Sequence, residues 1–125
     1  MKLEELQIYQ LAMSLGEKVW TVVEPWGYFL KDTLGKQLVR ATDSIAANIA
    51  EGYGRFHFKE NLNFCFYSRG SLQETRTWLT KARNRNLIET EKFEELTQLC
   101  DQLSIKLNNY IKTIGKTPLK LNDNK

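Results

Sequence analysis

The sequence LVRATDSIAANIAEGYGR occupies residues 38–55 and carries the clearest packing signal in the chain. Its inward positions alternate spacings of four and three residues, which is the repeat of a helix that packs along one face. This seam comprises Leu34, Leu38, Ala41, Ile45, Asn48 and Gly52. Because alanine and glycine add little bulk, a neighbouring backbone can approach more closely than the usual ~8–10 Å. We therefore predict a tightly packed helix over residues 33–53.

The segment before this seam predicts another helix. Residues 3–23 keep apolar side chains at helical spacing, with two glutamates in the first turn, where the helix dipole favours acids. Residues 24–28 contain a proline and a glycine and break the pattern. Asp32 and Thr33 then offer an N-cap for the next helix. We expect one long loop between these two helices.

Two more helices follow, one over residues 58–85 and one that Thr90 caps. The last helix has an unbroken seam of Phe93, Leu96, Cys100, Leu103, Leu107, Tyr110 and Ile114, and Gly115 supplies its stop. No segment shows the period-two alternation typical of a strand. Short connections between long helices favour an all-α, antiparallel up-down-up-down four-helix bundle over residues 1–115. Residues 116–125 are expected to form a basic, disordered tail.

Composition and charge narrow the function classes. A chain of 125 residues with 42% hydrophobic content forms one domain. No segment reaches the ~20 apolar residues of a membrane span and the N-terminus is acidic, so we expect a cytoplasmic protein with no membrane partner. Net charge is +3, yet residues 31–88 hold ten basic against five acidic side chains. Cys65 and Cys100 fall on apolar stripes and are expected to be buried and reduced.

Arginines recur every seven residues in the third predicted helix, at Arg69, Arg76 and Arg83, and so lie along one line. A phosphate backbone could follow that line. The candidate nucleic-acid-binding residues are Arg55, Lys59, Arg69, Arg76, Arg83 and Arg85. The alternative is that the arginines form ion pairs with Glu51, Glu74 or acids of the last helix, within or between subunits.

Catalytic and cofactor chemistry is not indicated. A di-iron bundle needs two Glu-x-x-His pairs, whereas this chain has one histidine, His57, in the reversed order His-Phe-Lys-Glu. The two seam cysteines cannot complete a zinc site with it. No glycine-rich loop follows a strand. We expect no enzymatic activity, metal, cofactor or small-molecule substrate.

Aromatic residues are more numerous than one small bundle has to bury. Phe64, Tyr67 and Trp78 lie off the Leu62, Leu72 and Leu79 stripe of their helix. An apolar face left outside a bundle is typical of a partner surface, so these residues predict a homo-oligomer interface. A wider core shared by three neighbouring helices is the alternative explanation.

Residues 38–55 resemble the signature of the family of bacterial four-helix bundles named after 23S ribosomal RNA intervening sequences. Gly70-Ser71-Leu72-Gln73-Glu74 and residues 82–88 resemble the third helix and the following turn of that family. The structural motif positions are Asn48, Glu51, Gly52 and Gly70, and a partner for Asn48 would fix helix register or subunit docking.

The resemblance implies a ring-like homopentamer with a central pore and no enzymatic activity. The chain is similar, more distantly, to the accessory variability determinants of diversity-generating retroelements, which bind a reverse transcriptase and nucleic acid. The function expected from sequence is thus a non-catalytic homo-oligomeric scaffold that binds RNA or a nucleic-acid-processing partner. The alternative is a protein–protein interaction module without nucleic-acid binding.

Overall fold

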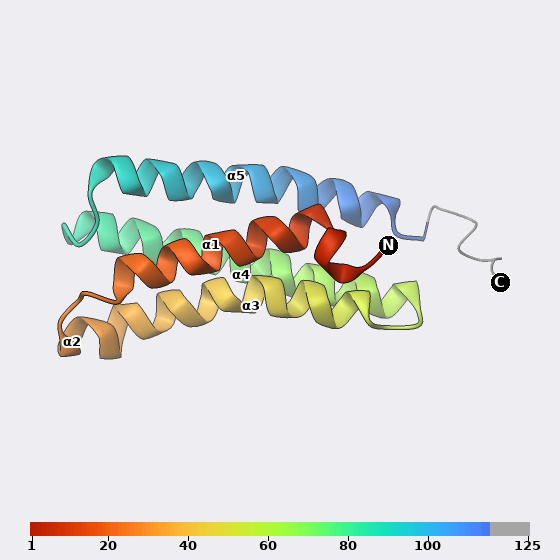
Figure 1. Cartoon of the computed structure of the whole chain (residues 1–125), viewed down its shortest axis with the longest axis horizontal. Coiled ribbons are helices and arrows are strands. Elements are labelled where there is room, and N and C mark those ends of the chain that lie inside the picture. Colours follow the sequence, from red (N-terminus) through yellow and green to blue (C-terminus); the bar gives the residue numbers. More distant parts are fainter. Residues whose placement is uncertain (116–125) are drawn as a thin grey trace.

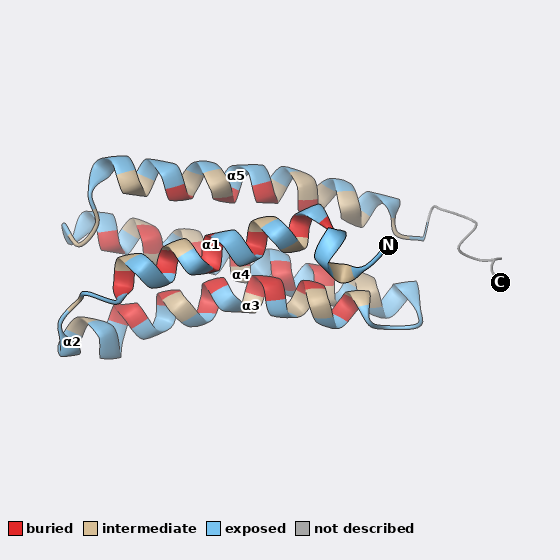
Figure 2. Cartoon of the chain, in the orientation of Figure 1, coloured by how far each residue is buried: buried red, intermediate tan, exposed pale blue. Residues whose placement is uncertain are grey.

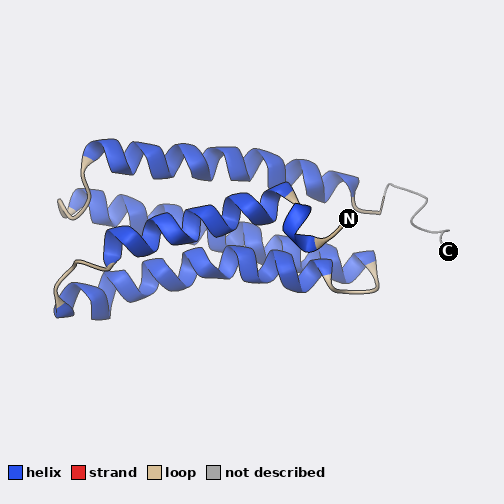
Figure 3. Cartoon of the chain, in the orientation of Figure 1, coloured by secondary structure: helices blue, strands red, loops and turns tan. Residues whose placement is uncertain are grey.

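The computed structural model describes residues 1–115, and within that range every element is helical (Figure 3). The predicted tail, residues 116–125, lies outside the described residues. The four long helices are α1 (Gln7–Val23), α3 (Lys36–Tyr53), α4 (Phe58–Asn84) and α5 (Thr90–Thr113). The short α2 (Tyr28–Leu30) continues into α3 through a π-helical turn, Lys31–Gly35, and a 3₁₀ turn, Leu3–Glu5, precedes α1.

The long helices lie side by side as an antiparallel bundle (Figure 1). Helix α1 packs on α3 and α5, and α4 packs on the same two helices from the opposite corner. Helices that are consecutive in the chain are therefore neighbours, and the α1–α5 contact closes the bundle. The prediction of an all-α four-helix bundle is confirmed for the part of the chain that the structure describes.

The core runs along the inward stripes of all four helices (Figure 2). Its fully buried side chains include Leu15, Leu38, Ile45, Leu79, Leu96 and Leu103. Each such side chain stabilises the fold by about 1.5–3 kcal/mol relative to exposure. The cysteines are free and buried, as predicted, one on α4 and one on α5. The seam predicted for α5 supplies its buried residues.

Helices α3 and α4 form the closest pair, because small and hydroxyl-bearing residues meet between them. The Ser68 hydroxyl donates to the Ile45 carbonyl at 2.8 Å, and the Thr42 and Thr75 hydroxyl oxygens are 3.4 Å apart. A Cβ added to Gly52 would lie 2.6 Å from Asn61 Oδ1. These contacts hold the end of α3 directly against α4. They therefore fix the position of the α3–α4 turn and its side chains.

The prediction that the second long helix starts at Thr33 is wrong, because the helical segment already begins at Tyr28. Gly27 is its N-cap, with φ −69° and ψ 169°. The Thr33 hydroxyl donates to the Phe29 carbonyl at 2.7 Å, so this threonine lies inside the helix instead of capping it. The π-helical turn places Gly35 against α1, where a Cβ would lie 2.8 Å from the Val23 side chain.

Two other boundaries also differ from prediction. The first helix is interrupted at Leu6, whose backbone is extended with φ −77° and ψ 119° and whose side chain is buried. Burial of Leu6 accounts for the break, since it turns the chain onto the core. Helix α5 starts at Thr90, but its N-cap is Glu89 and no side chain caps it. Among the described helices none is long and apolar enough to cross a membrane.

Candidate functional site

The arginines that recur every seven residues, Arg69, Arg76 and Arg83, form a row on the α5 side of α4. Each member of this arginine row contacts α5. Arg69 Nη1 donates to Asn108 Oδ1 at 2.9 Å. Arg76 Nη2 lies 2.8 Å from Asp101 Oδ1. The Arg83 guanidinium lies over the Phe93 ring, 4.4 Å from its centroid, in a cation–π contact. The row therefore holds α4 and α5 in register along most of their shared length.

Only part of the positive charge in this row is neutralised. Arg76 has the carboxylate partner that the ion-pair alternative anticipated, on the last helix. Arg69 and Arg83 have no carboxylate within ion-pair distance among residues 1–115. Arg69 also stacks on the Phe66 ring, 5.0 Å from its centroid. Two guanidinium groups thus keep an uncompensated charge at an exposed helix face.

The other predicted basic residues lie at the two ends of α4. Arg55 pairs with Glu51 at 2.8 Å and approaches Glu60 at 3.9 Å, so two acids surround it. Lys59 and Arg85 are exposed and form no ion pair within the described part of the chain. The structure therefore does not gather the six candidate residues into one patch.

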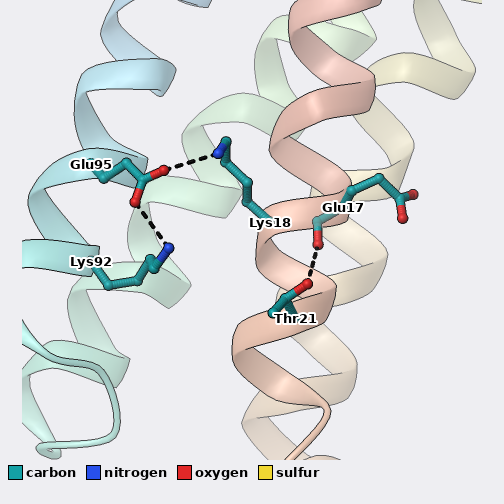
Figure 4. Close-up of polar contacts among 5 residues, drawn as sticks. All are labelled: Glu17, Lys18, Thr21, Lys92 and Glu95. Atoms are coloured by element: carbon teal, nitrogen blue, oxygen red, sulfur yellow. Dashed lines mark hydrogen bonds and ion pairs between the residues drawn. The ribbon is translucent and has the colours of Figure 1, made fainter.

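A cluster of charged side chains likewise connects α1 to α5 (Figure 4). Lys18 of α1 lies 3.0 Å from one oxygen of Glu95, and Lys92 lies 2.9 Å from the other. Hydrogen bonds from Lys92 and Lys18 lower the pKa of the Glu95 carboxyl below its ordinary value. On the same stretch of α1, the Thr21 hydroxyl donates to the Glu17 carbonyl at 3.1 Å (Figure 4).

The three residues predicted as an outer aromatic face are not equally exposed. Tyr67 is 57% exposed, but Phe64 and Trp78 are half-buried. Trp78 packs against the core, and its indole Nε1 is buried without a hydrogen-bond partner. Describing Trp78 as outward-facing is therefore wrong, whereas Phe64 lies beside Gly52 of α3 and meets the Tyr67 ring edge-on. The packing of Trp78 agrees with the wider-core alternative, whereas an interface role for Phe64 stays a prediction.

The motif residues fall into two groups. Gly52 is buried at the α3–α4 contact, and Glu51 holds Arg55. Asn48 is only half-buried, and its amide donates to the Ser44 carbonyl of its own helix at 2.9 Å. Placing Asn48 on the inward seam is wrong, since the buried position is Ile49. Gly70 is exposed, and a Cβ built on it would meet no atom within 4 Å.

The sequence model of the family described as 23S rRNA-intervening sequence protein matches residues 4–109. The chain belongs to this family. A similar solved structure is a protein of unknown function from the S23 ribosomal protein family of Bacteroides thetaiotaomicron. It shares 21% identity with a TM-score of 0.76, and the match covers 85% of this chain and 99% of that one. No curated protein matches the chain.

In this member of the 23S rRNA-intervening sequence protein family, two exposed aromatic residues escaped sequence prediction as site residues. Phe66 lies one residue before Tyr67 on the outer face of α4, and Phe56 lies in the α3–α4 turn. A seven-residue repeat that starts at the buried Cys65 marks the inward stripe of α4. This repeat would have placed Phe66 outside the stripe, beside Arg69. Among residues 1–115 no three His, Cys, Asp or Glu side chains converge as metal ligands would.

Proposed function

We propose that this protein is a non-catalytic scaffold that assembles with copies of itself, as a pentameric ring in the arrangement that the resemblance implies. The assembly presents basic side chains to RNA or to a nucleic-acid-processing protein such as a reverse transcriptase. The proposal is supported by the composition of the α4 outer face, where apolar rings and a glycine are exposed on a rigid helix.

Gly70 carries the self-association half of this proposal. It lies within the 27 residues of α4, where glycine destabilises a helix by about 1 kcal/mol relative to alanine. Nothing within the subunit requires it, because space is open around its α-carbon. Phe66 and Tyr67 are exposed one turn earlier on the same face. A second subunit that packs against Gly70 and these rings accounts for all three residues.

Native mass spectrometry at micromolar concentration tests this assembly. The parent is expected to form a defined oligomer, and Tyr67→Glu combined with Phe66→Glu is expected to reduce it to monomers of unchanged helicity. Phe29→Glu is the matched control, since Phe29 is 74% exposed at the other end of the bundle. A monomeric parent, or an oligomer that survives the double change, contradicts the assembly through α4.

The uncompensated guanidinium groups of Arg69 and Arg83 support the RNA-binding half. Each phosphate that such a group neutralises releases a counterion, so binding should weaken steeply as salt rises. We expect Arg69→Gln with Arg83→Gln to weaken binding of structured RNA and to flatten its salt dependence. Lys31→Gln with Lys36→Gln, on another helix, removes the same charge and controls for net charge.

A nuclease-treated pull-down separates this function from a protein–protein interaction module that binds no nucleic acid. The scaffold that contacts RNA should lose partners on nuclease treatment or fail to retain them when Arg69 and Arg83 are replaced. Full retention in both cases, together with no binding of RNA at low salt, favours the interaction module.

A further inference from the structure

The turn between α3 and α4 exposes aromatic rings where a helix connection is normally polar. Phe56 is 94% exposed and Phe58 is 47% exposed. The His57 ring stands edge-on to Phe56, with centroids 5.0 Å apart and an interplanar angle of 80°. Three consecutive rings thus lie at one end of the bundle, and Phe56 is almost fully exposed there.

Phe58 is held in place by the fold. Gly115, with φ +82°, approaches it so closely that a Cβ there would lie 3.1 Å from the ring. The ring of Phe58 therefore lies against the backbone just after α5, while about half of the residue stays exposed. A groove of about 510 Å³ lined by His57, Phe58, Lys59 and Glu60 lies beside it. The site combines a fixed ring with space beside it and a free ring two residues earlier in the chain.

Exposed lysines lie at this end of the bundle. Lys59 on α4 and Lys112 in the last turn of α5 are exposed and form no ion pair within residues 1–115. The N-terminal residue is at the same end, because the Tyr53 hydroxyl donates to the Met1 carbonyl. Both nearby acids of α3 and α4, Glu51 and Glu60, lie within ion-pair distance of Arg55. Lys59 and Lys112 are thus free to contact phosphates, while Glu60, which lines the groove, lies 3.9 Å from Arg55.

We propose that this turn binds unpaired nucleotides of single-stranded RNA. Phe56 and Phe58 stack on successive bases, while Lys59 and Lys112 contact the phosphates that flank them. This inference rests on the proposed RNA-binding function and names the form of RNA that the site takes. Base faces are hidden in a duplex, so aromatic side chains that stack on bases select unpaired strands. An apolar protein segment fits less well, since the rings are separate and bordered by unpaired cations.

Fluorescence anisotropy with a 12-nucleotide oligouridine and a 12-base-pair RNA duplex, at low salt, tests the inference. Replacing Phe56 with alanine should weaken oligouridine binding about 5- to 150-fold, which is the effect of losing one stacked base. Phe56→Trp should retain binding, whereas Phe56→Leu, which stays apolar but cannot stack, should lose it. The matched control is Phe29→Ala, which removes an exposed ring from the opposite end and should change nothing.

Ultraviolet crosslinking to the same oligouridine locates the contact independently. Trypsin cleaves after Arg55 and Lys59, so the expected adduct is on the peptide of residues 56–59. An adduct that maps elsewhere in the chain overturns the site.

The anisotropy outcomes separate this inference from the proposed function. If the parent and Phe56→Ala bind oligouridine equally well, or if the parent binds only the duplex, the inference is overturned and the RNA-binding function stands. Parent protein that binds neither the oligonucleotide nor structured RNA at low salt overturns both. Because Phe56 makes no packing contact that the fold needs, loss of binding without loss of helicity supports the stacking site.

Discussion

Arg76 Nη2 of α4 lies 2.8 Å from Asp101 Oδ1 of α5, and the Arg76 side chain is only 29% exposed. It is the middle contact of the arginine row, between the hydrogen bond of Arg69 and the ring contact of Arg83. A partly buried pair in the middle of a long helix interface does more to fix register than to add stability. The same arginine cannot serve RNA without giving up its partner.

Exchanging the two charges tests this role of the pair. Arg76→Asp should destabilise the fold by about 1 kcal/mol, because it replaces a modest attraction with two facing carboxylates. Adding Asp101→Arg should restore most of the loss. Urea unfolding followed by circular dichroism measures both variants. The exposed Lys36–Asp32 pair, within one helical segment, offers the control exchange, and an equal effect there would show that the interhelical position is unimportant.

Gly52→Ala should destabilise the protein by about 1–3 kcal/mol, since overpacking at a close helix contact forces the backbone to shift. Its Cβ would lie 2.6 Å from Asn61 Oδ1 and 2.9 Å from Phe64 Cβ. Thermal unfolding measures the change. Gly70→Ala is the matched control and should stabilise the isolated subunit by up to about 1 kcal/mol, because only helix propensity changes there. Both are best compared with Tyr67→Glu and Phe66→Glu present to keep subunits separate.

Asp43→Asn should raise stability at neutral pH and leave it unchanged in acid. Burial and the neighbouring Glu17 raise the pKa of the Asp43 carboxyl above its ordinary value of 3.8. A raised folded-state pKa means that ionisation opposes folding, so the penalty is complete at neutral pH and disappears below the ordinary value. Denaturant midpoints at pH 7 and pH 3 would measure the difference.

Glu95→Gln should change the stability at neutral pH in the opposite direction. Its pKa is lowered by Lys92 and Lys18, so the ionised form stabilises the fold above the ordinary value of 4.5 and this contribution is lost as pH falls through the lowered value. Glu95→Gln should therefore lower stability at pH 7, where Asp43→Asn raises it. The same sign for both variants at neutral pH would contradict the electrostatic explanation.

The native thiols should resist alkylation. Burial raises the pKa of Cys65 and of Cys100 to about 11 from 9.0. Each unit lowers the reactive thiolate fraction about tenfold, so iodoacetamide at pH 8 should modify neither cysteine until the chain unfolds. Mass spectrometry before and after addition of denaturant counts the adducts. Rapid modification of the folded protein would show that the α4–α5 interior opens.

Strong periodicity made α5 predictable to within a residue, whereas the start of the second long helix was missed. Asp32 and Thr33 look like caps in sequence, yet the Thr33 hydroxyl is satisfied by a carbonyl one turn back. Residue type alone cannot separate these two hydrogen-bonding patterns.

The position of Asn48 was predicted wrongly for a different reason. A strict three-and-four count drifts on a straight helix of 3.6 residues per turn, and the apolar Ile49 occupies the core instead.

The candidate sites were only partly predictable. Spacing placed the arginines on one line, but their partners became visible only when α5 was laid antiparallel to α4. Phe93, Asp101 and Asn108 then meet Arg83, Arg76 and Arg69 in reverse order. Exposure of aromatic residues depends on helix rotation, which is why Tyr67 was placed correctly and Trp78 was not.

The chain enters and leaves the bundle at one end, with Met1 on Tyr53 and Gly115 on Phe58 (Figure 1). A pulling force applied between residues 1 and 115 would thus separate α1 from α5 progressively, starting at the end where these two residues lie. Contacts loaded one after another in this geometry break at lower force than contacts sheared together. The subunit should be mechanically compliant along this axis, with the Lys18–Glu95 bridge among the later contacts to part.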